Sequence, residues 1–340
     1  MLPDAAPNPL PPSPPPTVAQ LAGQRIVFPF AGMTPPASLK ARIRRGEAAG
    51  VILFGGNVRS IAQVRRLTKE LQAIPRPAAL DQPLIVAVDQ EGGQVQRLPG
   101  GPHRSPPRIS ATKSTAIAQA EGASAARTLR AAGVNLDLAP VVDVARPGSQ
   151  MQREGRSFGA DAATVGRYAA PFVRGLVAGG VAATAKHFPG FGAAAANTDT
   201  ARVTIRASLD ELRTVDRPPF LAAVAAGAQL VMLSSAVYPA LDTRPALLSR
   251  KIATTELRTN AGFHGVTITD ALDTTQLAPY KDVAVRAADA GDDLLVYSSP
   301  AAAERAATAL AAALGRGRLK VRAARAVLDR VLGLRATLTE

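Results

Sequence analysis

The sequence predicts an α/β protein built as a single (β/α)8 TIM-type barrel. Eight short apolar segments, rich in β-branched residues, recur along the chain from about residue 20 onward. Between most of them lie Ala-, Arg- and Leu-rich segments whose apolar residues have helical spacing. No change in composition divides residues 20–338, and 340 residues are enough for one large barrel.

The predicted strands are near-continuous apolar runs, as expected where helices cover the outside of a parallel sheet and side chains fill its inside. In chain order they cover residues 25–30, 50–54, 84–89, 134–143, 181–187, 228–234, 265–270 and 293–298. The predicted helices cover residues 36–48, 60–73, 114–131, 161–178, 208–226, 249–260, 281–290, 300–314 and 317–336. We expect the last two helices to complete the outer ring. A count of eight strands favours a closed barrel over an open doubly wound sheet, with room for irregular strands.

Residues 1–19 are interpreted as a Pro-rich tail or linker that precedes the barrel of residues 20–338. Eight of residues 1–16 are proline, a composition that favours an extended chain and cannot join a core. The segment lacks the charged start, apolar run and small-residue cleavage site of a signal peptide. Localisation stays open between a cytoplasmic appendage and a spacer behind an export signal upstream.

Composition excludes several classes of function. The chain has no cysteine, which excludes disulfides, thiolate metal sites and cysteine nucleophiles. No run of eighteen apolar residues predicts a transmembrane segment. The net charge of +14 comes from arginines scattered singly, and aromatic residues make up only 4% with no Trp, so we expect no specific nucleic-acid binding. We expect a monomer.

Several of the apolar runs end in polar or charged residues. In a barrel of parallel strands, the carboxyl ends of all strands meet at one mouth, where catalytic residues collect. The strand-end residues are Asp89, Asp143, Lys186, His187, Ser234 and Asp270. We therefore predict one polar site at this mouth. Single members also have structural interpretations: Asp143 as a turn cap and Ser234 as a partner of the backbone.

Sequence motifs for bound cofactors are missing. The chain has no GxxxxGK[ST] phosphate loop, no complete GxGxxG after a strand and no HExxH pair, and it contains only three histidines. We expect neither a metal nor an organic cofactor.

Four motifs, in this order along the chain, resemble glycoside hydrolase family 3, with the likeness extending over about residues 20–335. They are Val88–Arg97 (VDQEGGQVQR), Gly155–Gly159 (GRSFG), Lys186–Gly190 (KHFPG) and Thr269–Leu272 (TDAL). Within the family, the chain is most similar to bacterial β-N-acetylglucosaminidases of the NagZ-like β-N-acetylhexosaminidase type. This resemblance implies the (β/α)8 fold and a carbohydrate substrate.

The resemblance also implies roles for individual residues. Asp270 matches the catalytic nucleophile of the family's [ST]-D-D-L segment, whose second Asp is Ala271 here. The family's sugar-binding positions match Asp89, Arg97, Arg156, Lys186 and His187. Carboxylates accept hydrogen bonds from sugar hydroxyls, and Arg and Lys donate to ring substituents. Ser234 is added as a binding residue from its place at a strand end.

One loop departs from the family pattern. NagZ-like members carry K-H-F-P-G-H-G and then D-[ST]-H, whose His is the acid/base. Here Phe191 replaces the first loop His, Asp199 matches the Asp of the dyad, and Ala201 stands at the position of the acid/base His. Three hypotheses follow: Asp199 is the acid/base on a flexible loop, another residue supplies the proton, or the acid is lost.

The sequence thus predicts a retaining glycoside hydrolase that releases terminal β-linked N-acetylglucosamine from cell-wall (peptidoglycan-derived) fragments. Asp270 is the predicted nucleophile and Asp199 the preferred acid/base. A catalytically impaired sugar-binding protein and a β-glucosidase-type hydrolase stay open as alternatives. The discriminating feature is whether the 190–201 loop brings Asp199 to the Asp270 side of the mouth.

Overall fold

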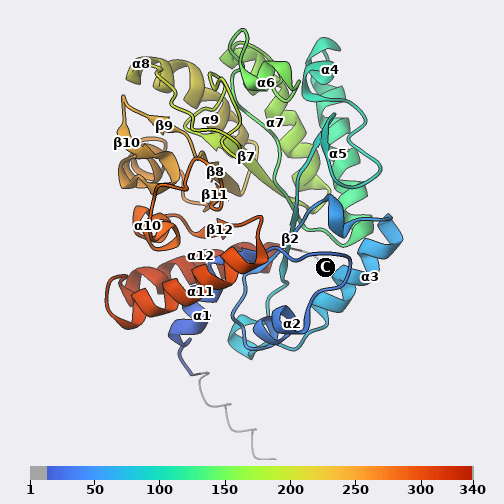
Figure 1. Ribbon diagram of the computed structural model, residues 1–340. Helices are drawn as coiled ribbons and strands as arrows, with labels where there is room; N and C mark the ends of the chain where they lie inside the picture. Colours follow the sequence, from blue (N-terminus) through green and yellow to red (C-terminus); the bar gives the residue numbers. More distant parts are fainter. Residues whose placement is uncertain (1–13, 339–340) are drawn as a thin grey trace, which may run out of the picture.

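A closed barrel of eight parallel strands forms the centre of the computed structural model, which describes residues 14–338 (Figure 1). Its strands are β1 (Ile26–Phe28), β2 (Gly50–Leu53), β3 (Ile85–Val88), β6 (Leu136–Asp137), β7 (Ala182–Phe188), β8 (Leu230–Leu233), β11 (Val266–Ala271) and β12 (Leu294–Val296). Each strand pairs in parallel with the next, and β12 closes onto β1 with Leu295 opposite Ile26. The predicted (β/α)8 TIM-type barrel is therefore confirmed.

Helices surround the barrel and occupy most of the predicted segments. They are α1 (Val18–Gly23), α2 (Ala37–Arg44), α3 (Ile61–Gln72), α4 (Pro106–Ala111), α5 (Thr115–Ala132), α6 (Gln150–Arg153), α7 (Ala162–Ala178), α8 (Leu209–Glu211), α9 (Arg217–Ala225), α10 (Val283–Ala290), α11 (Pro300–Gly315) and α12 (Val321–Thr337). Two segments are π-helical, η3 (Leu212–Asp216) and η5 (Lys251–Asn260). Short 3-10 turns are η1 (Gly55–Asn57), η2 (Ala78–Leu80) and η4 (Ala246–Leu248).

Side-chain caps fix where several helices begin. Thr17 and Gln20 form a capping box at the start of α1, while residues 1–13 of the predicted tail lie outside the described residues. Ser114 caps α5, which ends at Gly133 with a φ of 74°, a conformation that glycine adopts without strain. Asp161 caps α7 by accepting a hydrogen bond from the backbone of Thr164.

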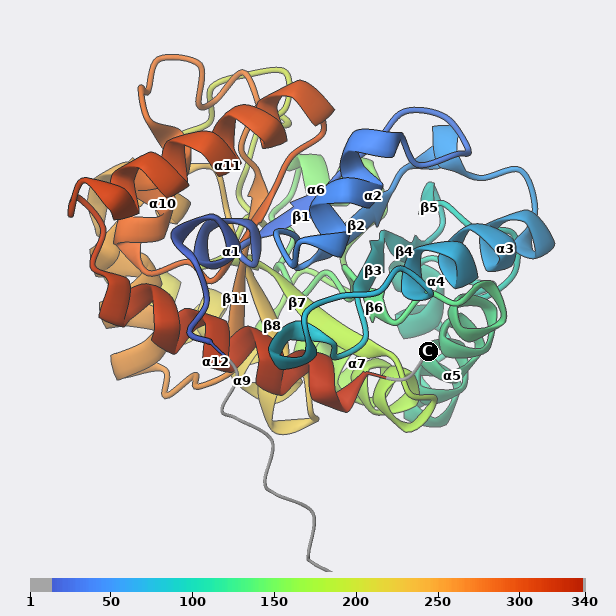
Figure 2. The same cartoon turned by 90° about the horizontal axis from the view of Figure 1, so that it is seen from below.

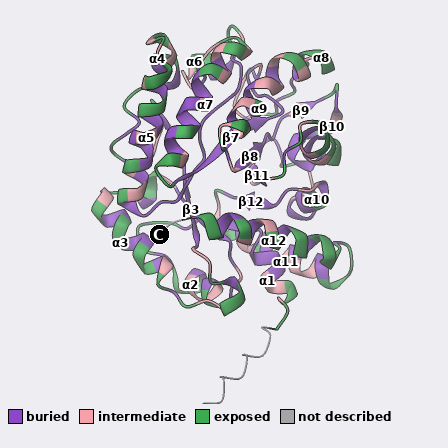
Figure 3. Ribbon diagram, turned by 180° about the vertical axis from the view of Figure 1, so that it is seen from behind, coloured by how far each residue is buried: buried purple, intermediate pink, exposed green. Residues whose placement is uncertain are grey.

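Two apolar layers hold the barrel together (Figure 3). One lies inside the barrel and includes Ile52, Leu136, Met232 and Ile268. The other lies between the strands and the surrounding helices, whose outer faces are exposed. Because both faces of the sheet are buried, the strands carry apolar residues at successive positions rather than at alternate ones.

Helix α12 differs from its predicted place in the outer ring. Its residues Val327, Val331 and Leu334 pack against the apolar side chains of the barrel interior, so the helix covers one end of the barrel (Figure 2). Near its end, the buried Arg335 donates to the side chain of Gln24 and to the backbone carbonyl of Pro83, which lie just before β1 and β3. This end is therefore the amino-terminal end of the strands, and the opposite mouth stays open.

Two small hairpins lie at the open end of the barrel. One pairs β4 (Gln90–Gly92) with β5 (Val95–Gln96), and the other pairs β9 (Val237–Tyr238) with β10 (Asp242–Pro245). The strand register also shifts near the carboxyl ends of β7 and β11. Such irregularities re-aim side chains where strands meet a site. In the part of the chain that the structure describes, no helix combines the length and apolar character needed to cross a membrane.

Candidate active site

A cavity of about 530 Å³ opens at the carboxyl ends of the barrel strands. Seven of the predicted site residues line it: Asp89, Arg97, Arg156, Lys186, His187, Asp199 and Asp270. Asp89 follows β3, Lys186 and His187 belong to β7, and Asp270 belongs to β11. The strand ends thus bring together side chains that are far apart in the sequence.

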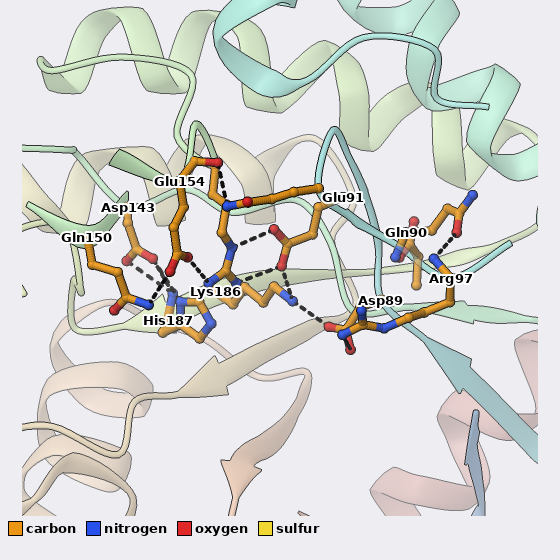
Figure 4. A network of polar contacts seen from close by, with 12 residues as sticks. Asp89, Gln90, Glu91, Arg97, Asp143, Gln150, Glu154, Lys186 and His187 are labelled. Atoms are coloured by element: carbon orange, nitrogen blue, oxygen red, sulfur yellow. Dashed lines mark hydrogen bonds and ion pairs between the residues drawn. The ribbon is translucent and has the colours of Figure 1, made fainter. Parts of the chain in front are cut away.

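A buried ion network forms one side of this cavity (Figure 4). The Nζ of Lys186 lies 2.7 Å from Asp89 Oδ1 and 2.7 Å from Glu91 Oε1. The guanidinium of Arg156 donates twice to Glu91, from Nε and Nη2, each at 2.8 Å. Glu91 is therefore clamped between two cations, and its side chain is fully buried.

Charge pairing decides the protonation of this network. Burial alone would raise the pKa of Glu91, but Lys186 and Arg156 outweigh it and lower the pKa to about 2. Burial likewise opposes the charge of Lys186, yet Asp89 and Glu91 raise its pKa above the ordinary lysine value. Glu91, Lys186 and Arg156 are thus charged at neutral pH, and the two cations present fixed donors to the cavity.

Gln90 arranges the neighbouring loop and, with it, Arg97. Its side-chain oxygen accepts hydrogen bonds from the backbone N–H of Arg97 and Leu98, and its nitrogen donates to the carbonyls of Leu98 and Gly101. Arg97 Nη2 lies 3.7 Å from Asp89 Oδ2. Gln90, which follows Asp89 in the motif, thus holds the loop that places Arg97 beside Asp89 at the cavity wall.

His187 is held by a buried carboxylate. Asp143 accepts from the backbone N–H of His187, and its Oδ2 lies 2.8 Å from His187 Nδ1. The same carboxylate accepts from the N–H of Phe191 at 2.6 Å. Asp143 does not line the cavity, so this strand-end residue orients His187 and starts the following loop.

Asp270 lies in β11, half-buried at the cavity wall. Its Oδ1 accepts a hydrogen bond from the N–H of Ala271 at 2.8 Å. The preceding Thr269 is fully buried, and its hydroxyl accepts from the N–H of Val296 on the neighbouring strand at 3.1 Å. Packing on one side and strand pairing on the other thus orient this carboxylate into the open mouth.

Asp199 faces Asp270 from the segment between β7 and α8. Asp199 is exposed as a residue and also lines the cavity. Its partial removal from water and then the negative charge of Asp270 raise its pKa above the ordinary Asp value. Ala201 does not line the cavity. The loop therefore brings Asp199 to the Asp270 side of the mouth.

Ser234 departs from the other predicted site residues. It is fully buried, does not line the cavity, and accepts a hydrogen bond from the N–H of Ala236 at 3.0 Å. The carbonyl of Ser234 also accepts a hydrogen bond from the N–H of Leu247. These contacts agree with the interpretation of Ser234 as a partner of the backbone.

Further polar residues of the cavity wall were not predicted. They are Gln94, Gln150, Glu154, Asn197, Thr198, Asp273, Thr274 and Ser298. Most follow no apolar run, so the strand-end rule does not select them. Glu91, which does not line the cavity, stands inside the same motif as Asp89, and its role depends on a partner 65 residues away. Within residues 14–338, no group of three or more His, Cys, Asp or Glu side chains is arranged to hold a metal ion.

Two carboxylates, one from a strand end and one from a loop, lie with cationic donors at the mouth of a (β/α)8 barrel, which is the kind of site that glycoside hydrolases use. Residues 18–334 match the family model described as "Glycosyl hydrolase family 3 N terminal domain", and the chain belongs to this family.

Known proteins similar to this chain include both fungal and bacterial members. An "Uncharacterized secreted glycosyl hydrolase" of Arthroderma benhamiae is 41% identical over 317 residues, which cover 89% of each chain. A "Beta-hexosaminidase" of Stenotrophomonas maltophilia is 34% identical over 315 residues, covering 86% of this chain and 92% of the relative. The solved structure of a family 3 β-N-acetylglucosaminidase from Paenibacillus superposes with a TM-score of 0.89 at 32% identity. That match covers 95% of this chain but only 63% of the Paenibacillus chain.

Proposed function

We propose that this protein releases terminal β-linked N-acetylglucosamine by a retaining double displacement. The observation that carries the proposal is the placement of Asp199, from the segment after β7, and Asp270, from the end of β11, on the wall of one cavity. The family match and the β-hexosaminidase relatives confirm the prediction of a glycosidase of the β-N-acetylhexosaminidase type. The natural substrate that we propose, a peptidoglycan-derived fragment, rests on the resemblance to NagZ-like enzymes.

The two carboxylates divide the chemistry between them. In the first step, a carboxylate oxygen of Asp270 attacks the anomeric carbon while the bond to the leaving oxygen breaks. Asp199 gives its proton to that oxygen, and the aglycone departs as an alcohol. In the second step, Asp199 takes a proton from water, the water oxygen attacks the anomeric carbon, and Asp270 is released as a carboxylate.

The raised pKa of Asp199 supports its assignment as the proton donor. A carboxyl near another negative charge and partly removed from water keeps its proton to a higher pH than an ordinary Asp. The first step needs a proton on Asp199, and the raised pKa of Asp199 favours that state.

The ion network supplies the sugar-binding side of the cavity. We propose that Asp89 accepts hydrogen bonds from ring hydroxyls, whereas Arg97, Arg156 and Lys186 donate to ring oxygens and substituents. His187, held by Asp143, adds a fixed polar edge beside them. Because these groups are already paired, the site loses little side-chain freedom when it binds a sugar.

Hydrolysis of aryl β-N-acetylglucosaminides with leaving groups of rising pKa tests the mechanism. We expect Asp270→Asn to lose turnover but keep sugar binding. We expect Asp199→Ala to lose about 10²–10⁴-fold in kcat/KM with poor leaving groups, and much less with activated ones. Asp210→Ala, which removes an exposed carboxylate outside the cavity, is the matched control.

Each alternative has its own outcome. Wild type that binds N-acetylglucosamine but cleaves no aryl glycoside would identify a sugar-binding protein. Faster cleavage of aryl β-glucosides than of the N-acetyl substrates would identify a β-glucosidase-type enzyme. Equal losses for Asp199→Ala across all leaving groups would contradict Asp199 as the acid.

A further inference from the structure

The loop that carries Asp199 is anchored at both ends. Before Asp199, the carbonyls of Gly192 and Ala194 accept hydrogen bonds from the N–H groups of Arg146 and Gln150, at 2.9 and 2.8 Å. After it, the chain bonds to the loop that follows β11. The loop therefore spans from the segment after β6 to the segment that carries Asp270, instead of hanging free over the mouth.

The turn around Asp199 is itself well defined. Asn197 accepts from the N–H of Asp199 through its side-chain Oδ1 at 2.8 Å, and its carbonyl accepts from the N–H of Ala201 at 2.9 Å. These hydrogen bonds hold the residues around Asp199 in one turn. Its contacts with neighbouring loops then decide how near the Asp199 carboxyl comes to Asp270.

Gln276 makes two of those contacts. Its backbone N–H donates to the carbonyl of Thr198 at 3.2 Å, and its side-chain Oε1 accepts from the N–H of Val203 at 2.5 Å. The adjacent Thr275 donates its N–H to the carbonyl of Asp199 at 3.2 Å. Gln276 thus holds the chain on both sides of Asp199, from the same βα segment that carries Asp270.

These contacts are shielded from water. Gln276 is 4% exposed, Thr198 2% and Val203 4%. A buried hydrogen bond of this kind is costly to leave unmade, because the N–H of Val203 would then have no partner. The side chain of Gln276 itself does not line the cavity, so it acts on the reaction only through the loop.

We infer that Gln276 is a positioning residue that sets the separation between the proton donor Asp199 and the nucleophile Asp270. The inference rests on the proposed function. Proton transfer to the leaving oxygen depends steeply on geometry, and a displacement of about 1 Å can cost on the order of 100-fold. Asp270 and the ion network that we propose to bind the sugar lie on other segments.

The test compares Gln276→Met, which keeps the length of the side chain but removes the acceptor, with Gln276→Glu, which keeps an acceptor oxygen. The matched control is Gln229→Met. Gln229 also accepts a backbone N–H, that of Ala183 at 3.0 Å, but it precedes β8 at the far end of the barrel. All variants are compared by kcat/KM on aryl β-N-acetylglucosaminides with good and poor leaving groups, and by binding of N-acetylglucosamine.

We expect Gln276→Met to lose about 10- to 100-fold with poor leaving groups, within the range of general acid catalysis, and under about threefold with good ones. Sugar binding stays within about twofold of wild type, since the ion network is untouched. Gln276→Glu and Gln229→Met keep the wild-type dependence on the leaving group.

Three results overturn the inference: equal losses for good and poor leaving groups, no loss at all, or the same pattern in Gln229→Met. A Gln276→Glu variant as impaired as Gln276→Met also overturns it. The proposed function is tested separately, by the activity of Asp199→Ala on substrates with poor leaving groups. If that variant keeps its activity on poor leaving groups, Asp199 is not the acid, whatever Gln276 does.

Discussion

Replacement of Glu91 by Gln removes a negative charge from the most buried part of the site while keeping its shape. Lys186 and Arg156 both contact this carboxylate, at distances of 2.7 and 2.8 Å. Its pKa falls from an ordinary 4.5 to about 2 in the folded protein. At about 1.4 kcal/mol for each pH unit, that lowering corresponds to about 3 kcal/mol of stability. Breaking a buried ion pair by removing one partner costs about 3–5 kcal/mol, a range that agrees with this figure.

Urea denaturation between pH 4 and pH 8 measures this contribution. The folded pKa of Glu91 lies below the unfolded one, so its stabilisation is complete above about pH 4.5 and is lost as the pH falls towards about 2. We therefore expect Glu91→Gln to be less stable than wild type by about 3 kcal/mol at pH 7. The difference should stay constant from pH 6 to pH 8 and shrink below pH 4.5.

Glu154→Gln provides the matched control for Glu91→Gln. Glu154 also contacts Arg156, but at 3.4 Å and with its side chain 34% exposed. A partly exposed pair of this kind contributes under about 1 kcal/mol. Equal losses in the two variants, or a Glu91→Gln protein as stable as wild type at pH 7, would refute the reasoning. Loss of Glu91 should also raise KM, because Arg156 and Lys186 lose the group that orients them.

Two other predictions concern Asp199, the proposed acid, and Ser234, a predicted binding residue that does not line the cavity. The alkaline limb of the kcat/KM profile should lie at a higher pH than for an ordinary Asp, because Asp199 must be protonated and its pKa is raised. Asn197→Ala should move this limb to a still higher pH, because the hydrogen bond from Asn197 lowers the pKa of Asp199. A limb that moves down in Asn197→Ala would contradict this assignment. Ser234→Ala should change KM by less than about twofold and cost about 1 kcal/mol in urea denaturation, because its hydroxyl serves the N–H of Ala236. A large rise in KM would indicate that Ser234 takes part in sugar binding.

The barrel itself was predictable because burial on both faces leaves a plain signal in each strand. All eight predicted strands overlap a strand of the barrel, yet the run 134–143 shortens to β6, Leu136–Asp137. Pro140 lies in the remainder, and proline cannot donate to a strand ladder. Helix α12 was predicted in the outer ring, because apolar spacing shows which residues are buried but not whether strands or the end of a barrel cover them.

The site was predictable to the extent that it follows the strand ends. Asp89, Lys186 and Asp270 are found in this way because parallel strands deliver their last residues to one mouth. Ser234 follows the same rule, but the segment that returns through η4 covers it, and no local pattern shows such a cover. Gln276 has no local signal either, since its role exists only through its contacts with Thr198 and Val203.

An anchored loop suits a carboxyl acid in place of an imidazole. The Asp side chain carries its acidic group one methylene from the backbone, whereas the remote ring nitrogen of a histidine reaches further. A loop with Asp199 as the acid must therefore hold its backbone nearer to the leaving oxygen than a loop with a histidine. Gln276 bonds to Thr198 before Asp199 and to Val203 after it, and Thr275 donates to the carbonyl of Asp199, so these three hydrogen bonds join the backbone of the loop to the segment that follows β11. If Asp199 is the acid, as we propose, the anchored backbone of this loop supplies the reach that its short side chain lacks.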